Sequence, residues 1–238
     1  MALLNTESIK KYLISKKYFR SDEELVAKEI GNGNINYVFI VSSKDKSIVV
    51  KQSDVLLRSS KRPLDLYRSK VECRTLKLED KYAPGFVPKV YEYDENLNTI
   101  IMEDISEYKN LRFLLEDSEE IPFLSEEIAE FLAKSMLATS DLVMDSKEKK
   151  KLVKYFINPD MCDISEDLVL TEPYYNYKNR NVIKKDLQKF VDENLYNNEN
   201  LQTEICKLRY NFMNNAQALI HGDFHSGSIF VCNKGIKI

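Results

Sequence analysis

The sequence predicts an α+β protein of two lobes, in which an antiparallel sheet with one helix precedes a mostly helical lobe. Two patterns indicate this architecture. In residues 1–105, short β-branched runs alternate with turns, and one long helical pattern separates the third run from the fourth. After Ser106 the apolar spacing becomes that of helices. Strands joined by short turns pair antiparallel. We therefore predict lobes at 1–105 and 106–238.

The first lobe begins with a short helix. Asn5 or Thr6 can cap it, and Ile9, Leu13 and Ile14 then share one face. The second helix runs from Leu64 to about Asp80, where apolar residues recur at helical spacing. Five segments rich in β-branched residues and bounded by turn residues are predicted strands: Glu24–Ile30, Ile35–Ser42, Ser47–Gln52, Lys89–Asp94 and Thr99–Glu103.

The second lobe is predicted to be mainly helical. Ser125 is the predicted cap of a helix that presents Ile128, Phe131, Leu132 and Met136 on one face. Pro159 and Pro173 lead us to predict a loop over 157–180. The remaining predicted elements are helices at 147–156, 181–194 and 200–217 and short strands at Ala218–Ile220, Ile229–Val231 and from Ile236 onward.

Bulk properties exclude several classes of protein. Hydrophobic residues make up 43% and charged residues 31% of the 238, as in globular proteins, and no apolar run is long enough to span a bilayer. The N-terminus lacks a secretory signal, so we expect a cytoplasmic protein without a membrane partner. A net charge of −3 does not favour a nucleic-acid partner. The four widely spaced cysteines predict reduced thiols, and the run Lys147–Lys151 predicts a solvated helix face.

The segment His221–Ser228 carries the strongest chemical signal. It places both histidines of the chain, an aspartate and two serines between apolar runs, where a fold presents catalytic groups. One interpretation is a metal pair of His221 and His225. That pair needs a helix, which Gly222 and Gly227 disfavour.

The alternative is a kinase catalytic loop. In such a loop an aspartate orients a hydroxyl and takes its proton, and a residue five positions later faces the metal and phosphates. Asp223 and Ser228 have that spacing.

Other segments fit a nucleotide site only in combination. Gly31, Gly33 and Asn34 lie between the first two strands, where glycines let backbone N–H groups approach phosphates, although a hairpin turn needs no ligand. Lys51 is either a solvated strand residue or the lysine that holds phosphates, paired with Glu72 of the next helix. The residues that end the last predicted strand either simply terminate it or form an adenine hinge: Glu103, Asp104 and Ile105.

Together these motifs resemble the methylthioribose kinases, of the protein-kinase-like fold and the aminoglycoside phosphotransferase and choline kinase superfamily. The loop at 221–228 is similar to the family's H-G-D-L-H-T-G-S, residues 29–39 to E-I-G-D-G-N-L-N-x-V-F, and residues 102–106 to M-E-D-L-S. The resemblance covers essentially the whole chain. It includes three segments for which we expect structural roles: Thr139–Asp141, Asn158–Glu166 and Leu168–Pro173.

The resemblance implies an enzyme that uses ATP and Mg²⁺ to phosphorylate the anomeric hydroxyl of 5-methylthioribose in methionine salvage. Its partners would be ATP and the sugar, and the family's tendency to dimerise allows a homodimer. Asp223 would be the catalytic base and contact the substrate, and Ser228 would face the metal. The residues that the resemblance assigns to ATP are Gly31, Gly33, Asn34, Lys51, Glu72, Glu103, Asp104 and Ile105.

The chain departs from the family in one large respect. Family members continue into a D-P-E-F-A-F segment whose carboxylates hold magnesium, whereas this sequence stops at Ile238. We therefore expect a truncated chain with little activity of its own, since uncompensated charge on the transferred phosphoryl group would slow transfer. Asn32 in place of aspartate and Phe224 in place of leucine are mild changes.

Two rival functions stay open. A choline or aminoglycoside type of kinase would share the superfamily motifs, but Ser228 replaces the asparagine of those families, and the Asn158–Glu166 segment also weighs against this rival. A catalytically silent nucleotide-binding fragment would retain the first lobe without transferring phosphate.

Overall fold

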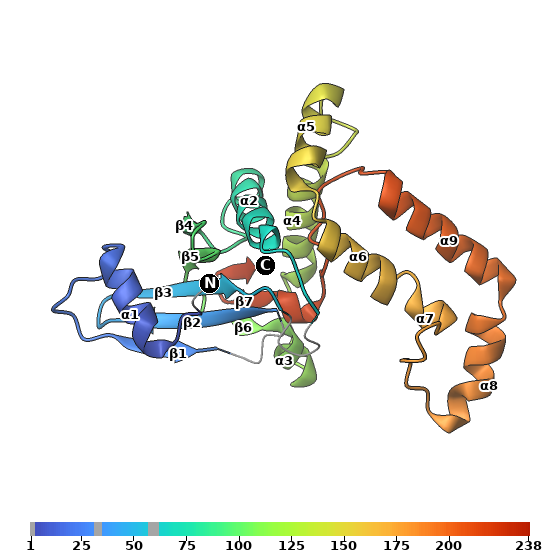
Figure 1. Ribbon diagram of the computed structural model, residues 1–238, viewed down its shortest axis with the longest axis horizontal. Coiled ribbons are helices and arrows are strands. Elements are labelled where there is room, and N and C mark those ends of the chain that lie inside the picture. The colour runs from blue at the N-terminus through green and yellow to red at the C-terminus, as the bar shows by residue number, and fades with distance from the viewer. Residues whose placement is uncertain (1–2, 31–34, 57–61) are drawn as a thin grey trace.

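The computed structural model describes residues 3–30, 35–56 and 62–238 and confirms the α+β class (Figure 1). Its larger sheet has the strand order β1-β2-β3-β5-β4, with every neighbouring pair antiparallel. The five strands are β1 (Val26–Glu29), β2 (Asn36–Ser42), β3 (Ser47–Ser53), β4 (Val90–Asp94) and β5 (Thr99–Glu103). A smaller antiparallel sheet contains β6 (Lys109–Asn110), β7 (Phe230–Cys232) and β8 (Gly235–Lys237).

Helix α1 (Thr6–Ser15) covers one face of the larger sheet. The Asn5 side chain accepts hydrogen bonds from the backbone N–H groups of Glu7 and Ser8 at 3.0 and 2.8 Å, which confirms the predicted cap. Beneath the helix lies a core of side chains no more than 4% exposed: Ile9, Leu13, Phe19, Phe39, Val41, Ile48, Val50 and Ile101. Because strand side chains alternate between faces, Lys51 lies on the other face of β3 from Val50.

A second core joins the smaller sheet to helices α2 (Tyr67–Tyr82), α3 (Leu111–Glu116) and α4 (Leu124–Ala138). Its centre is Phe131 of α4, which is 1% exposed. The Phe131 ring lies 6.0 Å from the Phe86 ring and is stacked 6.1 Å from the Phe224 ring. Phe224, which follows His221-Gly222-Asp223, is thereby packed against α4.

Beyond α4 the chain forms an arm that leads away from the two sheets (Figure 1). No helix within the described ranges is both long and apolar enough to cross a bilayer. Helix α5 (Ser146–Phe156) follows α4 and precedes the arm. The arm consists of α6 (Pro159–Leu168), α7 (Glu172–Tyr175), η1 (Lys185–Leu187), α8 (Gln188–Val191), η2 (Asp192–Tyr196) and α9 (Glu199–Asn214).

Several sequence-based predictions in the second lobe are wrong. The loop predicted over 157–180 contains α6 and α7, because each of its prolines occupies a first-turn position, where proline favours a helix. Residues 218–220 form no strand. Ser125 lies inside α4, which begins at Leu124. The helix predicted over 181–194 is instead a succession of short helical turns that starts at Lys185.

Candidate functional site

The candidate site begins with an ion pair between the larger sheet and α2. Lys51 of β3 donates a hydrogen bond from Nζ to Oε1 of Glu72. Their side chains are 25% and 31% exposed, so the pair is shielded yet reachable from solvent. The structure therefore brings together these two sequence-predicted residues. An ammonium ion fixed in this way is suited to holding an anion such as a phosphate.

Two arginines hold α2 in place around Glu72. Arg68, which is 5% exposed, donates to the carbonyl oxygens of Ile35 at 3.3 Å and Asp54 at 2.7 Å. Burial lowers the pKa of its guanidinium. On another side of the helix, the Arg74 guanidinium carbon lies 3.6 Å from the centre of the Tyr155 ring in α5. Helix α2 is thus anchored to both the sheet and the helical lobe.

The polar loop, defined as His221–Ser228, is shaped by its own side chains. Nδ1 of His221 accepts the backbone N–H of Asp223 at 3.2 Å, and Nδ1 of His225 accepts the backbone N–H of Gly227 at 2.9 Å. The Ser228 hydroxyl donates to the carbonyl oxygen of Asp223 at 2.8 Å. These bonds fix the backbone around Asp223, whose side chain stays 82% exposed and open to a ligand.

The polar loop and the Lys51–Glu72 pair lie close enough for their charges to interact. Burial of the His221 ring lowers the pKa of its imidazole below the usual 6.5, although the residue keeps contact with solvent. The charges of Asp223 and Glu72 oppose this shift, while those of His225 and Lys51 add to it. Two carboxylates, a lysine and two imidazoles thus share one electrostatic environment.

The polar loop is tied to the rest of the fold at both ends. At its C-terminal end, Asn110 Nδ2 donates to the carbonyl oxygen of Gly227 at 2.8 Å. Just after the loop, the backbone N–H of Leu111 donates to the carbonyl oxygen of Ile229 at 2.8 Å. Before it, the backbone N–H of Leu219 donates to Thr139 Oγ1 at 3.0 Å. The Leu219 N–H therefore bonds to a side chain and not to a neighbouring strand, and the strand predicted over 218–220 does not form.

Lys149 reinforces the approach to the polar loop. Its ammonium donates to the carbonyl oxygens of Thr139, at 3.0 Å, and Gln217, and it lies 3.0 Å from Asp141 Oδ1. Lys149 is 9% exposed, so the prediction of a solvated face for the run at 147–151 is wrong at this position, although its neighbours are exposed. The contacts give the Thr139–Asp141 segment a structural role.

The predicted hinge ends β5 next to β8. Glu103 Oε2 accepts from Lys237 Nζ at 2.9 Å and from the backbone N–H of Lys89 at 2.9 Å. Asp104 accepts from the backbone N–H of Ser106 at 2.9 Å, and the carbonyl oxygen of Ile105 accepts from that of Tyr108 at 2.9 Å. Sequence reasoning missed Lys237, because a lysine between two isoleucines looks like an ordinary strand residue.

The remaining predicted site residues concern phosphates and metal. Gly31, Gly33 and Asn34 lie outside the described residues. In the described part of the chain, no cluster of three or more His, Cys, Asp or Glu side chains can hold a metal ion. The Ser228 hydroxyl donates its proton to the backbone carbonyl oxygen of Asp223. Only the lone pairs of the hydroxyl oxygen are therefore left for a cation. These residues alone do not fit a magnesium site.

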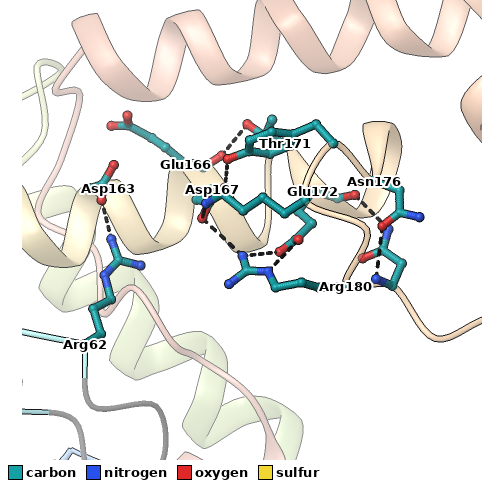
Figure 2. Close-up of polar contacts among 11 residues, drawn as sticks. Arg62, Asp163, Glu166, Asp167, Thr171, Glu172, Asn176 and Arg180 are labelled. Carbon is teal, nitrogen blue, oxygen red and sulfur yellow. Dashed lines mark hydrogen bonds and ion pairs between the residues drawn. The ribbon is translucent and has the colours of Figure 1, made fainter.

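Helix α6 contacts the segment that precedes α2, and Figure 2 shows Asp163 of α6 next to Arg62. Asp163 pairs with Arg62, and Asp160 Oδ2 accepts from the backbone N–H of Asp65 at 2.5 Å. Farther along, Arg180 donates from Nε to Glu172 Oε1 at 2.7 Å. These contacts give the segments Asn158–Glu166 and Leu168–Pro173 structural roles.

Comparison with curated proteins identifies similar chains. The chain is 40% identical over 223 residues to a methylthioribose kinase of Bacillus cereus, and equally so to one of Bacillus thuringiensis (strain Al Hakam). Each alignment covers 93% of this chain and 56% of the relative, so the chain spans about half the length of the curated relatives it matches. No family model matches.

Solved structures with the same fold are kinases of small molecules. An ethanolamine kinase of Plasmodium vivax gives a TM-score of 0.52 at 17% identity and covers 99% of this chain and 62% of its own. Spectinomycin phosphotransferase APH(9)-Ia, solved with ADP and spectinomycin, gives 0.51 at 13% identity and covers 100% and 68%. The fold is therefore the two-lobed, kinase-like α+β fold.

Proposed function

We propose that this chain, a relative of the methylthioribose kinases over 93% of its length, carries the nucleotide-binding and base-bearing parts of an enzyme that phosphorylates 5-methylthioribose. The observation that carries the proposal is the geometry of two groups: the Lys51 ammonium held by Glu72, and the exposed Asp223 carboxylate on a loop whose backbone is fixed by hydrogen bonds. A phosphate-binding cation and an exposed carboxylate base are the two side-chain groups that phosphoryl transfer from ATP most needs.

The reaction follows from these two groups. The anomeric hydroxyl oxygen attacks the γ-phosphorus of ATP, the bond from that phosphorus to the β–γ bridging oxygen breaks, and ADP leaves. The hydroxyl proton passes to the Asp223 carboxylate, which is 82% exposed and so accessible to a substrate. The products are ADP and the sugar 1-phosphate. Mg²⁺, when bound, would neutralise phosphate charge.

Lys51 would hold the α- and β-phosphates, with Glu72 fixing the direction of its ammonium. The loop of Gly31, Gly33 and Asn34 would cover the phosphates, and the backbone at Glu103, Asp104 and Ile105 would bind adenine. Ser228 would lie near the metal. We place the reaction in methionine salvage and in the cytoplasm, where ATP is available and where the four free cysteines would stay reduced.

Replacement of the base tests the proposal. In a protein extended to the full length of its relatives, Asp223→Asn should abolish sugar phosphorylation while ATP still binds, because an amide hydrogen-bonds but cannot accept the proton. A coupled ADP-release assay measures transfer, and calorimetry measures ATP binding. Asp186→Asn, at an exposed position of η1, is the matched control. Turnover of the Asp223 variant near that of the control would refute the assignment.

A further inference from the structure

His225 makes two contacts through its two ring nitrogens. Nδ1 accepts the backbone N–H of Gly227 at 2.9 Å, and Nε2 lies 3.4 Å from Oδ1 of Asp223. A ring nitrogen that accepts a hydrogen bond carries no proton, so the neutral imidazole must hold its proton on Nε2. The loop backbone therefore selects the tautomer that carries its proton on Nε2, the ring nitrogen that lies 3.4 Å from the Asp223 carboxylate without a hydrogen bond in this structure.

The absence of a side chain at Gly227 makes this arrangement possible. A Cβ atom there would lie 2.6 Å from Cε1 of His225 and 2.9 Å from Nη2 of Arg112, both closer than Cβ atoms approach other heavy atoms. The imidazole ring thus lies directly against the backbone that fixes its tautomer. Asn110 also holds Gly227, because Nδ2 of Asn110 donates a hydrogen bond to the carbonyl oxygen of Gly227 at 2.8 Å.

The Asp223 carboxylate needs an external contact to fix its direction. Its backbone is held through the N–H and the carbonyl oxygen, but the side chain is 82% exposed and can rotate. Over the described ranges, His225 is the one basic side chain within 4.0 Å of this carboxylate. The distance of 3.4 Å exceeds the roughly 3 Å of an ordinary hydrogen bond, and such contacts commonly shorten when a substrate binds.

We propose that His225 is a positioning residue, whose Nε2–H orients the Asp223 carboxylate so that its second oxygen faces the acceptor hydroxyl. The inference rests on the proposed function, because it assigns His225 to the base of that reaction. His225 itself takes no proton in the step. Its effect is to hold one carboxylate oxygen and so leave the other in line with the substrate.

Two variants separate positioning from loop structure. In His225→Asn the amide oxygen takes the place of Nδ1 and keeps the bond to Gly227, but no donor reaches Asp223. In His225→Gln the amide nitrogen takes the place of Nε2 and keeps the donor. We expect kcat of the full-length enzyme to fall about 100-fold in the Asn variant and less than about 10-fold in the Gln variant, with KM for ATP within about threefold in both. The opposite order of kcat would assign His225 to loop structure and overturn the proposal.

A measurement on the 238-residue chain is independent of the reaction. Nitrogen-15 NMR of the imidazole at pH 8 should show the His225 proton on Nε2, and a proton on Nδ1 would overturn the inference. A wild-type enzyme that leaves methylthioribose unphosphorylated would refute the proposed function, while the tautomer would still decide the geometry of His225. Conversely, an active wild type with the opposite variant order would leave the proposed function standing and remove the role of His225.

Discussion

The buried carboxyl of Glu79 makes a quantitative prediction about the stability of α2. Glu79 is 6% exposed, and it lies on α2 between Leu76 and Ala83, which both contribute to the second core. Burial is the single cause that raises the pKa of its carboxyl from 4.5 to about 7. No charge in the described part of the chain offsets this burial, so the folded state disfavours the ionised form.

The folded and unfolded chains bind the Glu79 proton over different pH ranges, and this difference sets the direction in which stability changes with pH. The folded chain holds the Glu79 proton up to about pH 7, whereas the unfolded chain releases it near 4.5, so ionisation costs folding free energy as the pH rises between these values. At about 1.4 kcal/mol per pKa unit, the cost is about 1 kcal/mol at pH 5 and about 3 kcal/mol at pH 8. Below pH 4.5 it disappears, because both states are protonated.

Glu79→Gln should remove this cost, since glutamine has nearly the shape of the protonated acid and does not ionise. We expect the free energy of unfolding to rise by about 3 kcal/mol at pH 8 and by about 1 kcal/mol at pH 5. Urea unfolding followed by far-UV circular dichroism measures it, because the chain has no tryptophan for fluorescence. Glu116→Gln, at an exposed position of α3, is the control. An equal gain for Glu79→Gln at both pH values would refute the reasoning.

Three further predictions test other parts of the structure. Offered ATP with methylthioribose, choline, homoserine or kanamycin, the full-length protein should phosphorylate the thiosugar alone; choline or kanamycin turnover at a comparable rate would favour a sister family. Lys149→Met should lower the free energy of unfolding by about 2–4 kcal/mol, because the Thr139 carbonyl oxygen loses its donor and the Gln217 carbonyl oxygen keeps the backbone N–H of Asp141 alone, while Lys150→Met should change it by less than about 0.5 kcal/mol. Equal urea midpoints would contradict a structural role for Lys149. Arg74→Met should speed amide hydrogen exchange throughout α2 by loosening its contact with Tyr155, with Lys77→Met as the control, and unchanged exchange would show that the contact does not hold the helix.

The first lobe could be predicted well because its signals are local. Asn5 as a cap, short turns and β-branched runs each indicate an element within a few residues, and α1, β1–β5 and α2 all form close to their predicted positions. In the second lobe, contacts between residues far apart in the sequence determine which elements form. Leu219 bonds to Thr139, 80 residues away, and therefore joins no strand. Pro159 in sequence indicates a break between elements, but in the structure it starts α6.

In the candidate site, too, some residues could be predicted from the sequence and others could not. The pairing of Lys51 with Glu72 follows from the family resemblance, and the structure confirms that they meet. The partners that fix the polar loop could not be predicted, because Asn110 reaches Gly227 across 117 positions of sequence and has no motif of its own. Lys237 likewise approaches Glu103 only because β8 lies beside Val87.

The alternation of side chains along β3 makes the position of Lys51 depend on the register of the sheet. Val50 belongs to the apolar core under α1, and Lys51, its neighbour, faces Glu72. A shift of one residue in the pairing of β2 with β3 would exchange these two side chains and bury an ammonium among Phe39, Val41 and Ile101. Misregistered chains would thus be too unstable to accumulate. Loss or gain of one residue in the turn at 43–46 should consequently yield unfolded protein rather than a folded protein with a misplaced lysine.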